Sequence, residues 1–594
     1  MFRLCLITLS LALLSACTGQ VPLVDAVEVD AVEPTTASAP PVAKNAAPKP
    51  PERAIPDDSL YPLLLAEFAL RRRAYDVALD NYMQQATLLR DPGVSAHTTH
   101  LTQFMRREQQ AMEAVSLWVE LEPDNVEANN TLATLLVRQG RAPEALPHLA
   151  LVERSGERAN FPVLLSDYAQ LDPDQREELA AGIDALALEF PENTQLLLLQ
   201  SLVHTEHEEF DAALAKLNTL FKLEPYQPQA LLLEAKILLA QSAKSPFKRL
   251  QKALAADPDN STLRLQYAQL LTTTDIDRAR EQFEILSAQS PRDGDLLLSL
   301  ALINREMDDD LAAKAYLRQL LGLEQRIDEA HYYLGRIAED AGELQAAVDE
   351  YKRVEDGREY LSANSRIGRI LIQEGMLEEN HGWFSQQRVQ RPARREQLYA
   401  LEADLLSKSG ASATALEVLN LALRDVPESD NLLYARAMLL EQQGELVSME
   451  ADLRTLIARD PDNTTAINAL GYTLANRTER YDEALQLITR ALELQPNEPA
   501  ILDSMGWVLY KTGRNEEALD YLKRAYAAFP DPEVAAHLGE VLWITGANEQ
   551  AIAVLQGARK KAPGHTVLND TIQRLGIELP RIPGGDAATR GSSD

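Results

Sequence analysis

Histidines spaced three residues apart are the side chains best placed for metal or acid–base chemistry in this chain. His204 and His207, and likewise His97 and His100, would share one face of a helix and could hold a metal ion together. No third ligand stands at a suitable spacing. Asp211 occupies the place of the second histidine that a zinc-protease motif would need after His207. We therefore interpret these histidines as surface residues.

Other catalytic signatures are missing from the sequence. No Gly-rich phosphate loop and no Gly-x-Ser-x-Gly nucleophile motif occurs. Runs of acids such as Asp308-Asp309-Asp310 are typical of solvated turns rather than of acid–base pairs. We predict that the chain is not an enzyme, that it has no catalytic residues, and that it binds no metal ion or cofactor.

Cys17 stands where a covalent modification is expected. An apolar run, Leu4–Leu14, follows Arg3 and is too short to remain in a bilayer as a spanning helix. It leads into Leu14-Ser15-Ala16-Cys17, which resembles the lipobox of bacterial lipoproteins. This resemblance implies that residues 1–16 are a cleaved signal peptide and that Cys17 carries diacylglycerol and palmitate. The alternative is an ordinary secretory signal with a chance cysteine. Thr18 follows Cys17 in place of Asp, which by resemblance to lipoprotein sorting implies the periplasmic face of the outer membrane.

Composition separates two ends of the chain from its body. Residues 17–57 are rich in proline and alanine, and residues 579–594 are rich in glycine and serine, so we predict a disordered tether and a disordered tail. The only other cysteine, Cys5, lies in the signal peptide, so the mature body has no disulfide. The net charge of −32 argues against nucleic acid as a partner and favours proteins with basic patches.

A period near 34 residues organises the body. The unit is clearest in residues 499–530, where Gly506 and Ala518 are small enough for two helices to approach and Gly513 ends the first helix. Prolines close successive units at Pro427, Pro461, Pro496, Pro530 and Pro563. This pattern resembles the tetratricopeptide repeat, a helix–turn–helix unit.

The resemblance implies an all-α fold, a superhelical solenoid of antiparallel helix pairs. Residues 58–326 would form divergent N-terminal repeats, with irregular stretches at 157–192 and 227–259. Residues 327–578 would form regular repeats that end in a capping helix near residues 566–575, because the last repeat would otherwise expose its apolar face.

Inward-facing positions of the first helices are candidates for a partner-binding groove. In this repeat class one face of each first helix turns inward, and several of these positions carry aromatic, amide or carboxylate side chains. We predict that the groove is formed by Tyr434, Asn468, Tyr472, Asp503, Trp507, Tyr510 and Trp543. The alternative for Trp507 and Trp543 is that they fill space between repeats.

Two arginine clusters stand out against the acidic background. Arg71-Arg72-Arg73 is one, and the other follows Trp383-Phe384 in an atypical repeat. The second cluster comprises Arg388, Arg391, Arg394 and Arg395. These arginines either form a docking site for an acidic protein or neutralise neighbouring acids.

The order of segments carries the functional prediction. A lipobox, a Pro/Ala-rich tether and a body of tetratricopeptide-like repeats resemble the outer-membrane lipoprotein adaptor that activates a periplasmic carboxy-terminal processing protease. The resemblance implies a scaffold that binds the protease and delivers protein substrates such as peptidoglycan hydrolases. One alternative is a repeat lipoprotein of an exopolysaccharide-export or pilus-assembly complex, and another is a hydrolase with helical repeats.

Overall fold

The computed structural model describes residues 55–579 apart from residue 167. The predicted signal peptide, Cys17, all but the last residues of the tether and all but the first residue of the tail lie outside the described residues. The chain divides into two compact units, with the division between Pro291 and Arg292. The boundary predicted at 326/327, between divergent and regular repeats, lies within the second unit.

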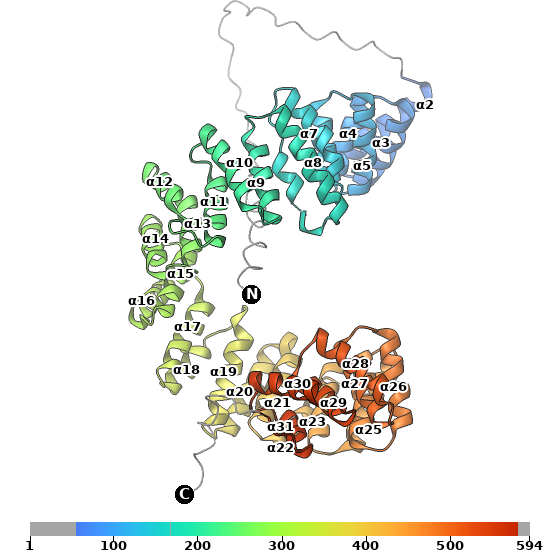
Figure 1. Ribbon diagram of the computed structural model, residues 1–594. Coiled ribbons are helices and arrows are strands. Elements are labelled where there is room, and N and C mark those ends of the chain that lie inside the picture. The colour runs from blue at the N-terminus through green and yellow to red at the C-terminus, as the bar shows by residue number, and fades with distance from the viewer. Residues whose placement is uncertain (1–54, 167, 580–594) are drawn as a thin grey trace, which may run out of the picture. The chain divides into compact units, whose positions relative to one another are not determined.

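The described residues of the first unit are helical (Figure 1). The helices are α2 (Asp57–Arg71), α3 (Tyr75–Leu89), α4 (Pro92–Phe104), α5 (Glu108–Leu121), α6 (Val126–Arg138), α7 (Ala142–Arg154), the 3₁₀ helices η1 (Phe161–Leu165) and η2 (Tyr168–Gln170), α8 (Pro173–Glu189), α9 (Thr194–Glu206), α10 (Phe210–Leu223), α11 (Pro228–Ala240), α12 (Lys248–Ala256), α13 (Ser261–Leu271) and α14 (Ile276–Gln289).

The second unit continues the pattern with more regular helix pairs. The helices are α15 (Gly294–Glu306), α16 (Asp310–Gly322), α17 (Ile327–Asp340), α18 (Leu344–Tyr351), α19 (Glu359–Gln373), α20 (Leu377–Gln390), the 3₁₀ helix η3 (Pro392–Arg394), α21 (Arg395–Lys408), α22 (Ser412–Asp425), α23 (Asp430–Gln442), α24 (Leu446–Arg459), α25 (Thr464–Arg477), α26 (Tyr481–Leu494), α27 (Pro499–Lys511), α28 (Asn515–Ala528), α29 (Pro532–Ile544), α30 (Asn548–Lys561) and α31 (Thr566–Arg574). The all-α prediction of stacked helix pairs is confirmed.

The pair α27 and α28 shows why this sequence forms hairpins. Pro499 is in the first turn of α27, where its missing N–H costs no helix hydrogen bond. Gly513 follows the helix with φ +80°, a conformation that glycine adopts without strain. A Cβ on Gly506 would lie 2.5 Å from Cγ of Leu522, so only glycine lets the two helices close. Leu522 is fully buried there, which stabilises the pair by about 1.5–3 kcal/mol.

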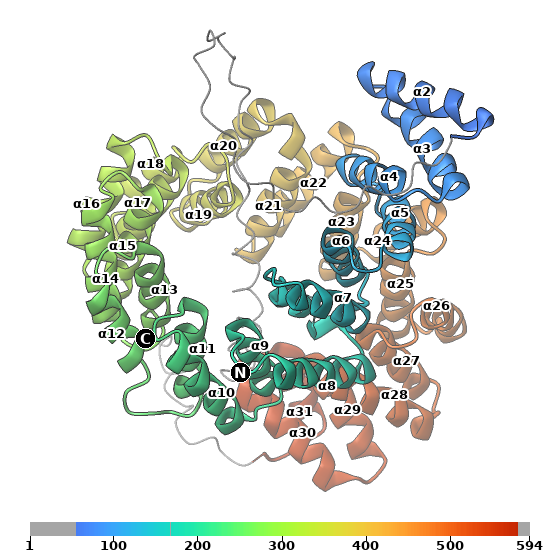
Figure 2. The ribbon, with the colours of Figure 1, turned by 90° about the horizontal axis from the view of Figure 1, so that it is seen from above.

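Neighbouring pairs share their core. One cluster of buried side chains extends from Leu433 on α23 to Ala551 on α30. First helices of consecutive pairs also contact one another, as α25 does α27 and α27 does α29, and they lie side by side in both views (Figures 1 and 2). Each hairpin therefore buries its apolar face against the next hairpin, and the first helices together form one face of the stack.

The irregular stretches and the terminal cap also have counterparts in the structure. Residues 157–192 hold η1, η2 and the long helix α8 in place of a helix pair, and α12 is a second helix of only nine residues. At the other end, α31 places Leu568 and Ile572 against buried residues of α29 and α30. The helix α31 thus covers the apolar face of the last pair, at the place where the sequence predicts a capping helix.

Candidate functional site

A groove of about 1060 Å³ lies along the first helices of the second unit. Side chains of α23, α25, α27 and α29 form its wall, and the segments that precede α27 and α29, together with Val567 of α31, complete it. Tyrosine, methionine and phenylalanine side chains alternate there with amides, hydroxyls and carboxylates. Such a wall can bury apolar side chains of a ligand and hydrogen-bond its backbone.

Four of the seven predicted groove residues line this groove. They are Tyr434, Asn468, Tyr472 and Asp503, contributed by α23, α25 and α27. The spacing of inward positions in the sequence predicts that these four residues lie together, because consecutive first helices have the same orientation in the stack.

The other three predicted residues lie away from the groove wall. Trp507 is 5% exposed, stacks on His537 with ring centroids 4.0 Å apart, and donates its indole N–H to Asn476 at 3.2 Å. Trp543 is half-buried against the apolar clusters of the last repeats. The Tyr510 hydroxyl donates to Glu540 at 3.0 Å. The structure thus places Trp507 in the space between repeats, which was the alternative position.

A buried polar cluster lies beneath the groove. His537 is 3% exposed, and its Nδ1 lies 2.9 Å from Oδ2 of Asp503. The Tyr472 hydroxyl donates to Glu533 at 2.7 Å and lies 3.4 Å from Nε2 of His537. Three consecutive first helices, α25, α27 and α29, are joined through these contacts, which fix the floor of the groove.

Burial and charge shift the pKa values of this cluster. Burial alone lowers the pKa of His537, but the carboxylates of Asp503, Glu533 and Glu540 outweigh burial and the net shift is upward. Burial raises the pKa of the Tyr472 phenol, and the carboxylate of Glu533 raises it further. The imidazole of His537 therefore holds its proton more tightly than a free histidine does.

The predicted groove residues did not include His537 and Glu533, although Glu533 stands at an inward position of its helix. His537 is the only histidine of α29, a mostly apolar helix, and it lies one residue beyond an inward position. The sequence could have indicated this residue, because a histidine at a helix position that faces the core needs a hydrogen-bonding or charged partner.

Arg388 of the second arginine cluster is not available for docking. Its side chain is buried, its Nη1 lies 2.5 Å from Oε2 of Glu402, and its guanidinium stacks 4.1 Å from the Tyr399 ring centroid. Glu402 is completely buried and also accepts from His381 at 3.0 Å. The docking prediction is wrong for Arg388, because a buried carboxylate needs this cation as its partner.

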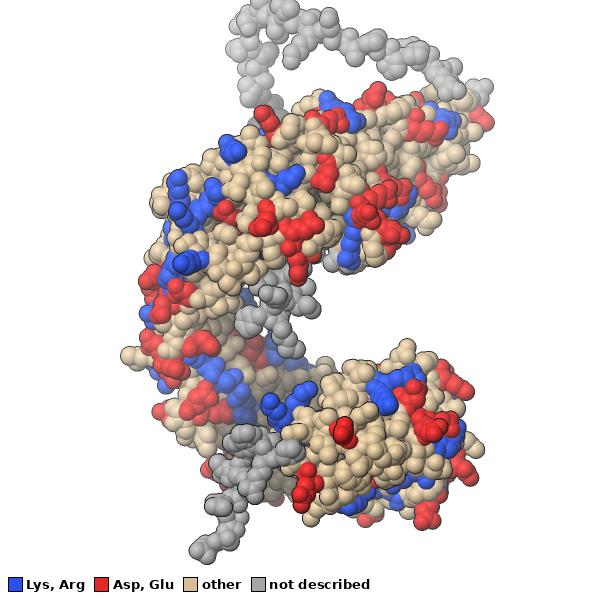
Figure 3. Space-filling model, viewed as in Figure 1, with Lys and Arg blue, Asp and Glu red and all other residues tan. Residues whose placement is uncertain are grey.

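The rest of that cluster pairs with nearby groups. Arg394 binds Asp356 at 2.6 Å, and Arg395 lies 3.4 Å from Asp425. The guanidinium of Arg391 lies 5.3 Å from the ring centroid of Tyr360. On the face drawn in Figure 3, basic and acidic side chains are interspersed over both units. These placements correspond to the alternative in which the arginines neutralise neighbouring acids.

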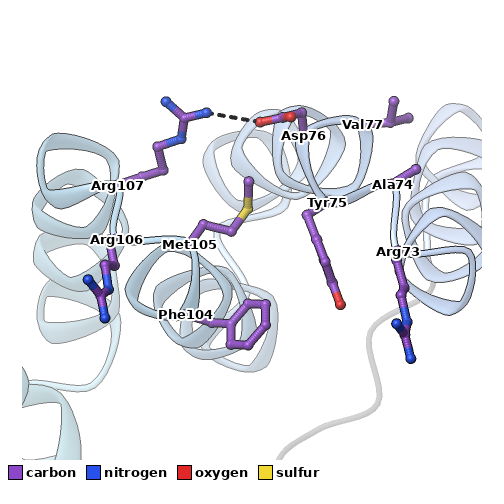
Figure 4. A pocket seen from close by; sticks show the side chains of 9 residues that line it. All are labelled: Arg73, Ala74, Tyr75, Asp76, Val77, Phe104, Met105, Arg106 and Arg107. Carbon is purple, nitrogen blue, oxygen red and sulfur yellow. Dashed lines mark hydrogen bonds and ion pairs between the residues drawn. The ribbon is translucent and has the colours of Figure 1, made fainter. Parts of the chain in front are cut away.

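The first unit holds a smaller hollow of about 540 Å³ beside the other arginine cluster (Figure 4). Tyr75 and Phe104 meet edge to face there, 5.2 Å apart, and both rings point to the same side as Arg73. Arg107 closes the opposite side by binding Asp76 at 3.1 Å.

The paired histidines separate into unrelated contacts. His97 packs on the Tyr82 ring, and His100 binds Glu127 at 2.9 Å. His204 binds Glu209 at 2.7 Å, and His207 faces the Tyr168 hydroxyl at 3.3 Å. No group of three or more potential ligands for a metal ion occurs among the described residues. Within that same part of the chain, no helix has the length and apolarity needed to cross a membrane.

Comparisons with known proteins identify the repeat. Family models described as "Tetratricopeptide repeat" match residues 462–531 and residues 310–360 and 504–566. The TPR repeat-containing protein PA4667 of Pseudomonas aeruginosa is 38% identical over 527 residues, which cover 88% of this chain and 89% of that protein. The chain belongs to the tetratricopeptide repeat family.

Solved structures with the same repeat are more distant. A thermophilic TPR protein of Thermus thermophilus is 24% identical and covers 30% of this chain and 97% of its own, with a TM-score of 0.28. Yeast Tom70 is 14% identical and covers 87% of this chain and 95% of its own, with a TM-score of 0.30.

Because tetratricopeptide repeats form surfaces for protein–protein contact, the chain is a protein-binding scaffold.

Proposed function

We propose that this protein is a lipid-anchored periplasmic adaptor. It binds and activates a carboxy-terminal processing protease and delivers protein substrates to it, peptidoglycan hydrolases among them. The groove on α23–α29 supports this proposal most directly, since it offers an open wall of aromatic and hydrogen-bonding side chains. The segment order at the N-terminus, with Cys17 after a short apolar run, supports an anchor at the outer membrane.

The groove suits a polypeptide better than a small molecule. Its residues come from four successive first helices, so its binding groups repeat along one direction as the residues of an extended chain do. Amide and hydroxyl groups such as Asn468 and Thr465 can pair with backbone groups, while Tyr434 and Phe529 can bury side chains.

Capture of partners from envelope extracts tests the adaptor role. The mature chain, residues 17–594, is immobilised, and bound proteins are identified by mass spectrometry. The matched variants are Thr465→Trp, which fills the groove from an exposed position, and Thr455→Trp, which adds the same ring on α24 outside it. We expect a serine protease and cell-wall hydrolases on the wild type and on Thr455→Trp, and a loss of at least one of them on Thr465→Trp.

The same experiment separates the competing functions. Capture of a secretin or an export porin would favour the export-machine alternative, and hydrolysis of peptidoglycan by the purified chain alone would favour an enzyme. Equal capture by both tryptophan variants would remove the groove from the proposal. For the anchor, Cys17→Ala is expected to abolish labelling with radioactive palmitate and to release the protein from the membrane fraction.

A further inference from the structure

The groove has a strongly negative wall. Five carboxylates line it, from Glu441, Glu498, Asp503, Asp531 and Glu533. Arg477 is the only lysine or arginine among the described residues of the wall, and its Nε binds Glu441 at 2.7 Å. The remaining four carboxylates therefore have no arginine or lysine of the groove wall to neutralise them.

Three of these carboxylates stand at the starts of α27 and α29, two helices that pack against each other. Glu498 is exposed just before α27, and Asp531 caps α29 by accepting the backbone N–H of Glu533 at 2.8 Å. Among the described residues, the carboxylate of Glu533 has the neutral Tyr472 hydroxyl as its hydrogen-bond donor. Each helix N-terminus adds about half a positive charge, so two termini offset about one of the three carboxylates. The nearby imidazole of His537 is paired with Asp503, so the sum of the three carboxylates remains negative.

Asn468 provides an independent sign that a ligand belongs in the groove. Its Oδ1 is buried and has no hydrogen-bond partner among the described residues, although Asn468 lines the wall. A buried acceptor without a donor is unfavourable, and a rotation of the Asn468 amide toward the groove would let an N–H group of a ligand satisfy it.

We propose that the groove binds an extended basic segment of a partner protein. A lysine or arginine side chain of that segment lies against Glu498, Asp531 and Glu533, its aliphatic stem packs on neighbouring apolar groups such as Phe529, and a donor of the segment pairs with Asn468. This specificity rests on the proposed function, because it names the chemistry of the segment that the adaptor would hold.

Binding of short labelled peptides tests the proposal. The probes are a fluorescein-labelled peptide of alternating lysine and alanine and its counterpart with glutamate in place of lysine, measured by fluorescence anisotropy with the mature chain. The groove variant combines Glu498→Gln, Asp531→Asn and Glu533→Gln, which keep shape and leave an asparagine cap at α29. The control variant combines Glu516→Gln, Asp520→Asn and Glu549→Gln, three exposed acids outside the groove, so both variants lose the same charge.

The expected result is binding of the lysine peptide, about tenfold weaker in the groove variant, because each partly exposed charge pair contributes a factor of about two. The control variant should bind within about twofold of the wild type, and the glutamate peptide should not bind. Equal weakening in both variants would show general attraction to an acidic protein and overturn the proposal. Equal binding of the glutamate peptide would overturn it as well.

Failure of this specificity is distinguishable from failure of the adaptor function. If Thr465→Trp abolishes partner capture while the groove variant binds the lysine peptide as the wild type does, the groove binds partners but does not select basic segments. If Thr465→Trp leaves partner capture unchanged, the groove is not the adaptor site, whatever the peptides show.

Discussion

Replacing Glu402 by glutamine should destabilise the second unit strongly, although the substitution changes a single oxygen for an amide nitrogen. Glu402 is completely buried and Arg388 is 4% exposed, and the two side chains join α20 to α21. The guanidinium cannot lose its proton at accessible pH, so Glu402→Gln leaves a buried cation without a counter-charge. Breaking one partner of a buried ion pair costs about 3–5 kcal/mol. Glu517→Gln breaks an exposed pair with Arg514 and should leave stability unchanged.

Hydrogen exchange of the α20 and α21 amides is the appropriate assay, because a repeat array opens locally and its urea curve need not be two-state. We expect faster exchange in both helices for Glu402→Gln and wild-type exchange in α27. The double variant Arg388→Met with Glu402→Leu removes both charges and should recover most of the lost protection. Protection in Glu402→Gln within about 1 kcal/mol of the wild type would refute the structural role of this pair and return Arg388 to the list of candidate docking residues.

Three further substitutions test other parts of the second unit. Gly506→Val should lower the protection of the α27 and α28 amides against hydrogen exchange by about 1–3 kcal/mol, because its Cβ would lie 2.5 Å from Cγ of Leu522. Gly557→Ala has open space and should gain about 0.5–1 kcal/mol in α30; equal effects would contradict the close approach. The pKa of His537 is raised above its ordinary 6.5, so protonated His537 stabilises the folded state. This contribution is complete below pH 6.5 and is lost as the pH rises through the higher folded-state pKa. The loss of amide protection that H537Q causes in α27 and α29 should therefore shrink with rising pH in hydrogen exchange corrected for intrinsic rates, and a loss that grows would oppose this sign. Arg574→Ala removes both hydrogen bonds to a buried glutamate of α29, so the amides of α31 should exchange faster while those of α25 do not. Unchanged exchange in α31 would show that apolar contacts alone hold this helix in place.

The repeat architecture was predictable from the sequence because its causes are local. Gly506 and Ala518 recur at a fixed offset, Gly513 marks the turn, and each proline closes a unit, so periodicity alone specifies the hairpin. The capping helix followed from the same logic, since a last repeat without a cover would expose apolar surface. These features depend on a residue and its neighbours within about forty positions.

The site was predictable only in part, because inward positions do not all reach the same depth. Tyr434 and Tyr472 reach the groove, but Trp507, at the equivalent kind of position, turns into the layer below and stacks on His537. The direction of the Trp507 side chain depends on His537, a residue 30 positions away in the next repeat. The pattern of residues along one helix does not contain this information. For the same reason the sequence pattern predicted Arg388 to be a surface charge, because its buried partner lies on the following helix.

Packing between repeats and recognition in the groove are therefore linked through one layer of side chains. Asp503 lines the groove and also binds His537, on which Trp507 stacks. The same carboxylate that faces a ligand therefore helps to set the spacing of α27 and α29. A buried charged pair is a weak source of net stability but fixes register, because any other alignment of the helices leaves a charge unpaired. The polar floor accordingly specifies how consecutive first helices align, and that alignment determines which carboxylates converge on the ligand.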